Sequence, residues 1–188
     1  MAAATATIIP LEAVDPALIE EVLDRAFGPD RHARTAYRIR ERMAWLPGLS
    51  LAALDEDDLL VGTIQCWPAA LITREGPVPL VMAGPVAVVP ERQGEGFGSG
   101  LMSAMIAADA RLAAERGRQS SSSSAAVGQA NLPQVMIGDA AYYGRWGFSA
   151  ALTGGWRCPG PYDPARLLAR GAALAAMPGE GMLGPWPG

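Results

Sequence analysis

The apolar positions of this sequence fall into strand-like and helix-like patterns that predict a mixed α/β protein. The clearest segment begins with an apolar, β-branched run over residues 80–89 that stops at Pro90. A turn with several glycines follows over residues 93–100. Apolar residues then recur at helical spacing, at Phe97, Leu101, Met105, Ala108 and Leu112. This segment predicts a strand, a glycine turn and an amphipathic helix.

The first half of the chain predicts an edge strand, two helices and a hairpin. Asp15 and Pro16 are typical of a helix start, because aspartate caps the first turn and proline fits the first helical position. The predicted elements are an edge strand over 8–11, a helix from 16 to 27 with Leu18, Ile19, Val22, Leu23 and Ala26 on its apolar face, a second helix over 31–46, and strands over 49–54 and 59–73 joined by the acidic turn 55–58.

The second half predicts further elements around a polar, serine-rich segment. Residues 117–134 read as a flexible surface insertion, or alternatively as a substrate lid, within a single domain over residues 1–188. The predicted elements are a short strand over 135–138, a helix capped by Asp139, strands over 150–153 and 156–158, a last helix over 165–177 capped by Asp163, and a Gly/Pro-rich tail over 178–188 that Trp186 could pin.

The glycine turn has the character of an anion site. The first N–H groups of a helix have no intrahelical partner, and the helix dipole makes that end partly positive. Glycines remove Cβ atoms where a ligand oxyanion must approach backbone nitrogen, so a pyrophosphate would suit this turn. A nucleoside-triphosphate loop needs lysine, and the chain has none. The dinucleotide fingerprint also fails, because Ser99 and Leu101 stand where it needs glycine.

Two motifs resemble those of one acetyltransferase family. Val88, Pro90, Gln93, Gly96 and Gly98 fit the acetyl-CoA motif of the GCN5-related N-acetyltransferases (GNAT), V-x-P-x-x-Q/R-x-x-G-x-G after a strand. Further on, the run Gly-Asp-x-x-Tyr-Tyr-x-Arg-x-Gly-Phe over residues 138–148 resembles the family's second motif, and in particular the YhbS-type branch of predicted bacterial acetyltransferases.

The resemblance implies a fold, a co-substrate and site residues. The fold would be α/β (α+β), a central, mostly antiparallel mixed sheet of about six to seven strands flanked by helices. Acetyl-CoA would be the co-substrate, Tyr143 the general acid, and Asp139 or a water chain the base. If the motif match were shifted by one residue, the general acid would be Tyr142 instead of Tyr143. Backbone groups of Val86 and Val88 would pair with the pantetheine arm, and the pyrophosphate would lie on Gln93, Gly94, Glu95, Gly96, Phe97, Gly98 and Ser99.

Net charge, apolar runs and cysteine content limit which partners and which compartment we expect. The formal net charge of −4 and a pI near 5.0 argue against general nucleic-acid binding. No apolar run approaches the roughly 20 residues of a membrane span, and the first residues lack a secretory signal pattern. We therefore expect a cytoplasmic protein in which Cys66 and Cys158 are reduced thiols. No group of residues has metal-ligand spacing, so no metal is expected.

The sequence does not identify the acceptor substrate. The leading interpretation is an N-acetyltransferase that acts on a primary amine of a small molecule by direct attack. An arginine cluster over residues 31–42 is either a solvated helix face or a patch for an anionic or polynucleotide acceptor, which would suit a protein or aminoacyl-tRNA amine. A CoA-binding sensor without turnover is the alternative from another class. Apolar tail residues leave a homodimer possible.

Overall fold

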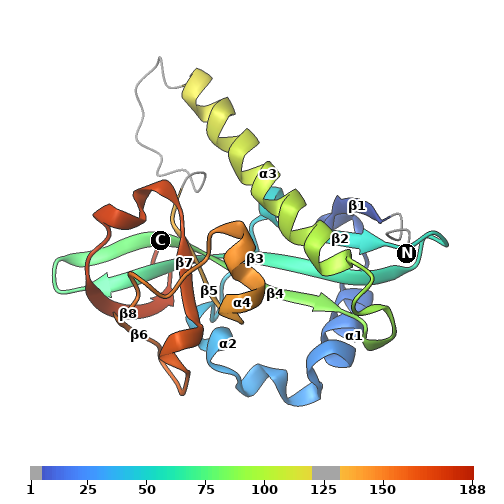
Figure 1. Cartoon of the computed structure of the whole chain (residues 1–188), viewed down its shortest axis with the longest axis horizontal. Coiled ribbons are helices and arrows are strands. Elements are labelled where there is room, and N and C mark those ends of the chain that lie inside the picture. Colours follow the sequence, from blue (N-terminus) through green and yellow to red (C-terminus); the bar gives the residue numbers. More distant parts are fainter. Residues whose placement is uncertain (1–5, 120–131) are drawn as a thin grey trace. The chain divides into compact units, whose positions relative to one another are not determined.

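The computed structural model describes residues 6–119 and 132–188 (Figure 1), which form two compact units built from interleaved segments. The first unit comprises Met1–His32, Trp45–Cys66 and Gly84–Arg111, and the second comprises Ala33–Ala44, Trp67–Ala83 and Leu112–Gly188. The single domain over residues 1–188 stays a prediction. Of the expected insertion over 117–134, residues 120–131 lie outside the described part of the chain.

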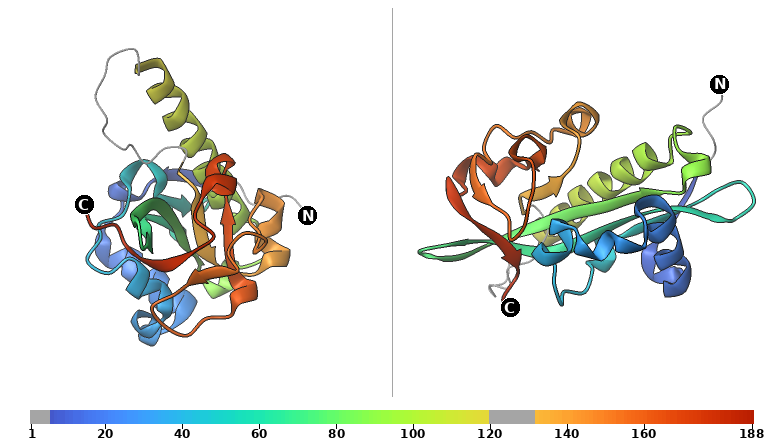
Figure 2. Two further views of the ribbon diagram at one scale, coloured as in Figure 1. Left: turned by 90° about the vertical axis from the view of Figure 1, so that its left-hand side faces the viewer. Right: turned by 90° about the horizontal axis from the view of Figure 1, so that it is seen from below.

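The first unit holds the N-terminal hairpin and the glycine turn. Strands β1 (Thr7–Pro10), β2 (Leu51–Leu54) and β3 (Leu60–Thr73) pair antiparallel, with Ile9 opposite Ala52 and Ala53 opposite Gly62. Strand β4 (Gly76–Val88) follows, and η4 (Pro90–Arg92) leads into the turn. Of these two long strands, the first unit contains only Leu60–Cys66 of β3 and Gly84–Val88 of β4. Figure 2 shows helices α1 (Pro16–Phe27) and α3 (Phe97–Gln119) on opposite faces of these strands.

Local sequence explains the two helices of this unit. The Asp15 carboxylate accepts a hydrogen bond from Ala17 N (2.9 Å), and Gly28, with a φ of 87°, ends α1 as predicted. The prediction that Leu18 lies on the buried face of α1 is wrong, because this residue is 48% exposed. On α3 the expected apolar face is buried at Phe97, Leu101, Met105 and Ala108.

The second unit is built around β5 (Gln134–Ile137). This strand pairs parallel to β4 at Val81 and Met82, and antiparallel to β7 (Leu167–Arg170). Strand β8 (Glu180–Pro185) pairs antiparallel to β3 and parallel to β6 (Gly155–Arg157). The largest fully buried side chain of this unit is Trp156, whose Nε1 donates to Pro178 O at 2.9 Å. Helices α2 (Thr35–Ile39) and α4 (Ala140–Tyr143) complete the unit.

The described strands confirm the predicted fold class. They form one eight-stranded sheet with the order β1-β2-β3-β4-β5-β7, and β8 pairs with both β3 and β6. Most pairings are antiparallel, as expected, and the sheet has at least one strand more than predicted. The remaining short 3₁₀ segments are η1 (Leu11–Ala13), η2 (Pro29–Ala33), η3 (Pro47–Leu49), η5 (Gly144–Trp146), η6 (Pro164–Arg166) and η7 (Ala172–Ala176).

The predicted second helix over 31–46 is wrong, because the chain forms two short pieces there. Arg34 is extended (φ −69°, ψ 146°) between η2 and α2, and Arg42 has a positive φ of 61°. Within the second unit, Thr35 Oγ1 donates to Pro161 O (2.5 Å) and Arg38 Nη1 to Pro159 O (3.0 Å). These contacts with a distant segment fix α2 and override the helical pattern of the sequence.

Three predictions for the C-terminal region are also wrong. The expected helix over 165–177 is a 3₁₀ turn capped by Asp163, then strand β7, then η7, because pairing with β5 and a positive φ at Gly171 outweigh the local helical spacing. Residues 150–153 form a turn held by the Thr153 hydroxyl, which contacts Ala150 O (3.2 Å) and Leu167 O (2.7 Å). The predicted tail instead contains β8.

None of the helices in residues 6–119 and 132–188 has the length and apolar character that a bilayer span requires.

Candidate active site

The glycine turn is held at both ends by buried anchors in the first unit. Val89 N donates to Val61 O (2.9 Å), and Phe97, the first residue of α3, is 1% exposed. Between these anchors, Gln93 Nε2 donates back to Val88 O (3.1 Å). The turn is therefore attached to the end of β4 by a side chain that the sequence motif had singled out.

The conformation of the turn requires glycine and leaves room beside it. Gly94 and Gly96 have φ values of +85° and +99°, which side-chain-bearing residues rarely adopt. A Cβ added at either position would meet nothing within 4 Å. Glycine is present here because of the backbone conformation and not because the interior is crowded. An open turn with two such glycines before a long helix fits the pyrophosphate of CoA.

The residues expected to hold the pantetheine arm lie just before this turn. Val86 and Val88 are half-buried on β4, and they alternate with the buried Ala87 and Val89. Both lie beyond Val81 and Met82, where β4 pairs with β5. A Cβ at Gly62 would come within 2.9 Å of Ala87 O, so β3 approaches β4 closely behind Val88. This packing fixes the end of β4.

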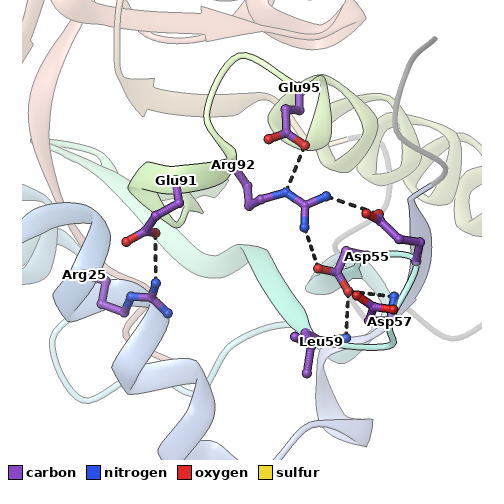
Figure 3. A network of polar contacts seen from close by, with 8 residues as sticks. Arg25, Asp55, Asp57, Leu59, Glu91, Arg92 and Glu95 are labelled. Atoms are coloured by element: carbon purple, nitrogen blue, oxygen red, sulfur yellow. Dashed lines mark hydrogen bonds and ion pairs between the residues drawn. The ribbon is translucent and has the colours of Figure 1, made fainter.

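Arg92, which is not one of the residues that define the sequence motif, contacts three carboxylates at the turn (Figure 3). Arg92 donates to Asp55 Oδ2 (2.6 Å), Glu56 Oε2 (3.2 Å) and Glu95 Oε2 (2.9 Å). Asp55 is almost fully buried, and its other oxygen accepts from Leu59 N and Asp57 N. The Leu59 N–H is the main cause that lowers the pKa of Asp55, and the Arg92 charge adds to it.

Tyr143, the predicted general acid, lies in the second unit at the end of α4. Burial, and secondarily the neighbouring Tyr142, raises the pKa of Tyr143 to about 12. Its ring makes edge contacts with the rings of Tyr142 (4.8 Å between centroids) and Phe148 (6.4 Å). A Cβ at Gly138 would come within 2.6 Å of two Tyr143 ring atoms. The phenol therefore stays protonated at neutral pH, as a proton donor must.

Asp139, the predicted alternative base, caps the helix that carries Tyr143. Its Oδ1 accepts from Ala141 N (2.8 Å) and Tyr142 N (3.3 Å), and the side chain is exposed. Tyr142 differs from Tyr143 in its surroundings, because the Arg145 guanidinium lies 4.5 Å from the centre of the Tyr142 ring. The structure thus gathers Asp139 and Tyr143 in one unit and Val86, Val88 and residues 93–99 in the other.

The arginine cluster over residues 31–42 is not simply a solvated face. Arg31 is 2% exposed and forms ion pairs with Glu20 and with Asp24, the latter at 2.8 Å. Arg40 is also buried, with its guanidinium 4.0 Å from the Tyr37 ring centre and 4.2 Å from that of Trp67. These side chains, like Arg38 on Pro159 O, make intramolecular contacts.

Two features of the site were missed in the sequence. Arg92 occupies a variable position of the motif, and two of its three partners, Asp55 and Glu56, are 37 and 36 residues away in the acidic turn, so only the fold connects them to Arg92. Gly138 is the last residue of the predicted strand over 135–138, and it directly precedes the Asp139 cap. Its closeness to the Tyr143 ring could have been suspected from the two residues' shared motif.

Comparison with family models finds a match over residues 8–151 to the model described as "Acetyltransferase (GNAT) domain". Comparison with curated protein sequences finds no match.

Solved structures with the same fold include several N-acetyltransferases. YhbS from Escherichia coli in complex with CoA has a TM-score of 0.68 and 23% identity, over 99% of this chain and 92% of that one. A GNAT family acetyltransferase from Brucella melitensis in complex with acetyl-CoA has a TM-score of 0.51 and 26% identity, over 90% and 98%. Arabidopsis thaliana Naa50 with the bisubstrate analogue CoA-Ac-MVNAL has a TM-score of 0.51 and 14% identity, over 88% and 97%.

Proposed function

The chain belongs to the GNAT acetyltransferase family, and from this premise we propose that it transfers an acetyl group from acetyl-CoA to a primary amine of a small molecule by direct attack. The observation that carries the proposal is the open turn at Gly94 and Gly96, between a strand end and a 23-residue helix. The Escherichia coli and Brucella melitensis structures, solved with CoA and acetyl-CoA, support this choice of co-substrate.

The chain's own groups hold the co-substrate at two places. Backbone N–H groups of residues 93–98, with Ser99 nearby, bind the pyrophosphate, because the start of α3 supplies donors and a partial positive charge. Backbone groups of Val86 and Val88 pair with the pantetheine arm, and the Val88 N–H faces the thioester oxygen. Acetyl-CoA supplies an activated acyl group and a thiolate leaving group.

Tyr143 gives its phenolic proton to the departing thiolate. The phenol carries its proton at neutral pH and can supply it, while burial, which raises its pKa, makes it a weaker acid than an exposed tyrosine. The attacking amine loses its proton to water or to Asp139, which would then serve both as helix cap and as proton acceptor. Removal of a proton-transfer group of this kind costs about 10²- to 10⁴-fold in rate.

A small-molecule amine fits the described arginines better than a polynucleotide does. Binding to nucleic acid phosphates requires accessible cationic side chains. Arg31 and Arg40 are buried and therefore not accessible to a phosphate, which leaves Arg34, Arg38 and Arg42 as the exposed arginines of the cluster, and Arg38 donates to Pro159 O. Arabidopsis thaliana Naa50 was solved with the bisubstrate analogue CoA-Ac-MVNAL, so an acceptor screen should include peptides as well.

Calorimetric titration with acetyl-CoA and CoA tests the co-substrate. We expect saturable binding that Gly96→Trp abolishes, because the new side chain strains the turn and fills the space beside it. Gly76→Trp is the matched control: Gly76 also has a positive φ (+124°) and open surroundings, but it is the first residue of β4, at the far end of that strand from the glycine turn. No binding by the unsubstituted protein at millimolar CoA would refute the proposal.

A thiol-release screen over small amines and peptides then separates an enzyme from a CoA-binding sensor. Tyr143→Phe should lose rate and keep CoA affinity if the protein turns over. Asp139→Asn is the sharper test of the base, because asparagine caps a helix about as well as aspartate but cannot take a proton. A wild-type rate in Asp139→Asn would assign the amine proton to water.

A further inference from the structure

The glycine turn is surrounded by carboxylates, which is an unexpected setting for an anion. Glu91 and Glu95 flank the turn, and Asp55 and Glu56 reach it from the β2–β3 turn. A pyrophosphate brought to the glycine run would be repelled by Glu95, Asp55 and Glu56 unless a cation offset them, whereas Glu91 lies outside that run. Figure 3 shows that two arginines are aimed at these groups.

Arg25 and Arg92 bind different carboxylates. Arg25, on α1, pairs with Glu91 at 2.8 Å, outside the glycine run. Arg92 uses all three of its nitrogens, Nε for Glu95, Nη1 for Asp55 and Nη2 for Glu56. A guanidinium can do this because its donors are fixed in a planar fork, which a lysine lacks.

The contacts of Arg92 span the turn and fasten it to a fixed support. Arg92 precedes Gly94, while Glu95 and Phe97 follow it. The Arg92 guanidinium carbon also lies 5.1 Å from the centre of the buried Phe97 ring. Asp55 is the support, since backbone N–H groups of Leu59 and Asp57 hold its other oxygen. The Glu95 carboxylate is thereby drawn toward the β2–β3 turn.

We infer that Arg92 is a positioning residue for pyrophosphate binding: it holds the Glu95 carboxylate against the Asp55–Glu56 turn and offsets its charge, so that the backbone of the glycine turn can accept an anion. This inference rests on the proposed function. It assigns Arg92 no contact with substrate, because its nitrogens already bind carboxylates. It explains how a turn with an acidic residue between two of its glycines can serve an anionic ligand.

The test measures CoA affinity by calorimetry for Arg92→Met, with Arg25→Met as the matched control. Arg92→Met should weaken CoA binding on the order of 10- to 100-fold, because Glu95 is left uncompensated beside the ligand. Arg25→Met removes a neighbouring ion pair of the same kind and should leave CoA affinity within about twofold. Arg92→Lys keeps the charge but not the fork, and it should fall between Arg92→Met and the wild type.

A second substitution separates this role from a general loss of structure. Adding Glu95→Gln to Arg92→Met should restore most of the CoA affinity, which a variant with a damaged fold would not regain. Wild-type CoA affinity in Arg92→Met, or no recovery in the double variant, would overturn the inference while the proposed function stands. If the wild-type protein binds no CoA, both fail together. Should Arg92→Met not fold, Arg92→Lys with and without Glu95→Gln provides the same comparison.

Discussion

Gly138→Ala should slow acetyl transfer by moving Tyr143 without altering its chemistry. The new Cβ would stand 2.6 Å from two atoms of the Tyr143 ring, whereas ordinary contact begins at 3.4 Å. The ring must therefore move by about 0.8 Å. Displacements of this size in a reacting group cost on the order of 10²-fold in rate, and such overpacking costs about 1–3 kcal/mol of stability.

The assay is steady-state thiol release, together with calorimetry for acetyl-CoA. We expect kcat to fall on the order of 10²-fold and the Kd of acetyl-CoA to stay unchanged, because the glycine turn is untouched. Gly144→Ala is the control: it follows Tyr143 directly, has helical φ and ψ (−56°, −29°), and a Cβ there would meet nothing within 4 Å. A wild-type kcat in a Gly138→Ala protein whose near-ultraviolet circular dichroism has changed would refute the role of Tyr143.

Three further predictions concern stability and thiol chemistry. Burial raises the pKa of Cys66 to about 12 and that of Cys158 to about 11, so both thiols should react slowly with an aromatic disulfide at pH 8 until urea unfolds the protein; fast labelling of the native protein would contradict this. The pKa of Asp55 is lower in the folded state than its unfolded value of 3.8, so the ionised carboxylate stabilises the folded state above pH 3.8, and this stabilisation is lost as the pH falls through the folded pKa. In urea titrations, Asp55→Asn should therefore lower the free energy of unfolding at pH 7 and change it little at pH 2. Equal losses at the two pH values would contradict this prediction. Trp156→Ala should lower the free energy of unfolding by about 3–5 kcal/mol, because a buried indole is removed and Pro178 O loses the N–H that donates to it; a change under about 1 kcal/mol would show that the core collapses onto the site.

The parts of the fold that were predicted correctly depend on neighbours in the sequence. The Asp15 cap, the Gly28 stop and the face of α3 from Phe97 to Ala108 all follow from local rules. The glycine turn was also predicted from local sequence, because its glycines lie within a few residues of one another and Gly94 and Gly96 have positive φ values that favour glycine.

The parts that were wrong depend on partners far along the chain. Leu167 and Leu168 fit a helical spacing equally well, yet both lie in β7 because β5 offers hydrogen bonds that a local pattern cannot reveal. The same holds at the site, where Arg92 meets Asp55 only after the β2–β3 hairpin has formed. Sequence motifs therefore identified the groups proposed to face the ligand, whereas the groups that support them emerged from the structure.

The pairing of β8 with β3 has a consequence for biosynthesis. Ile72 lies opposite Met182, 110 residues later in the chain. At about 5–20 residues per second, a ribosome needs roughly 5–20 s to supply that partner. During this interval the β3 edge has open backbone groups of the kind that recruit other chains. We expect co-translational chaperones to matter most while β3 has been made and β8 has not, and slow translation between them to increase aggregation.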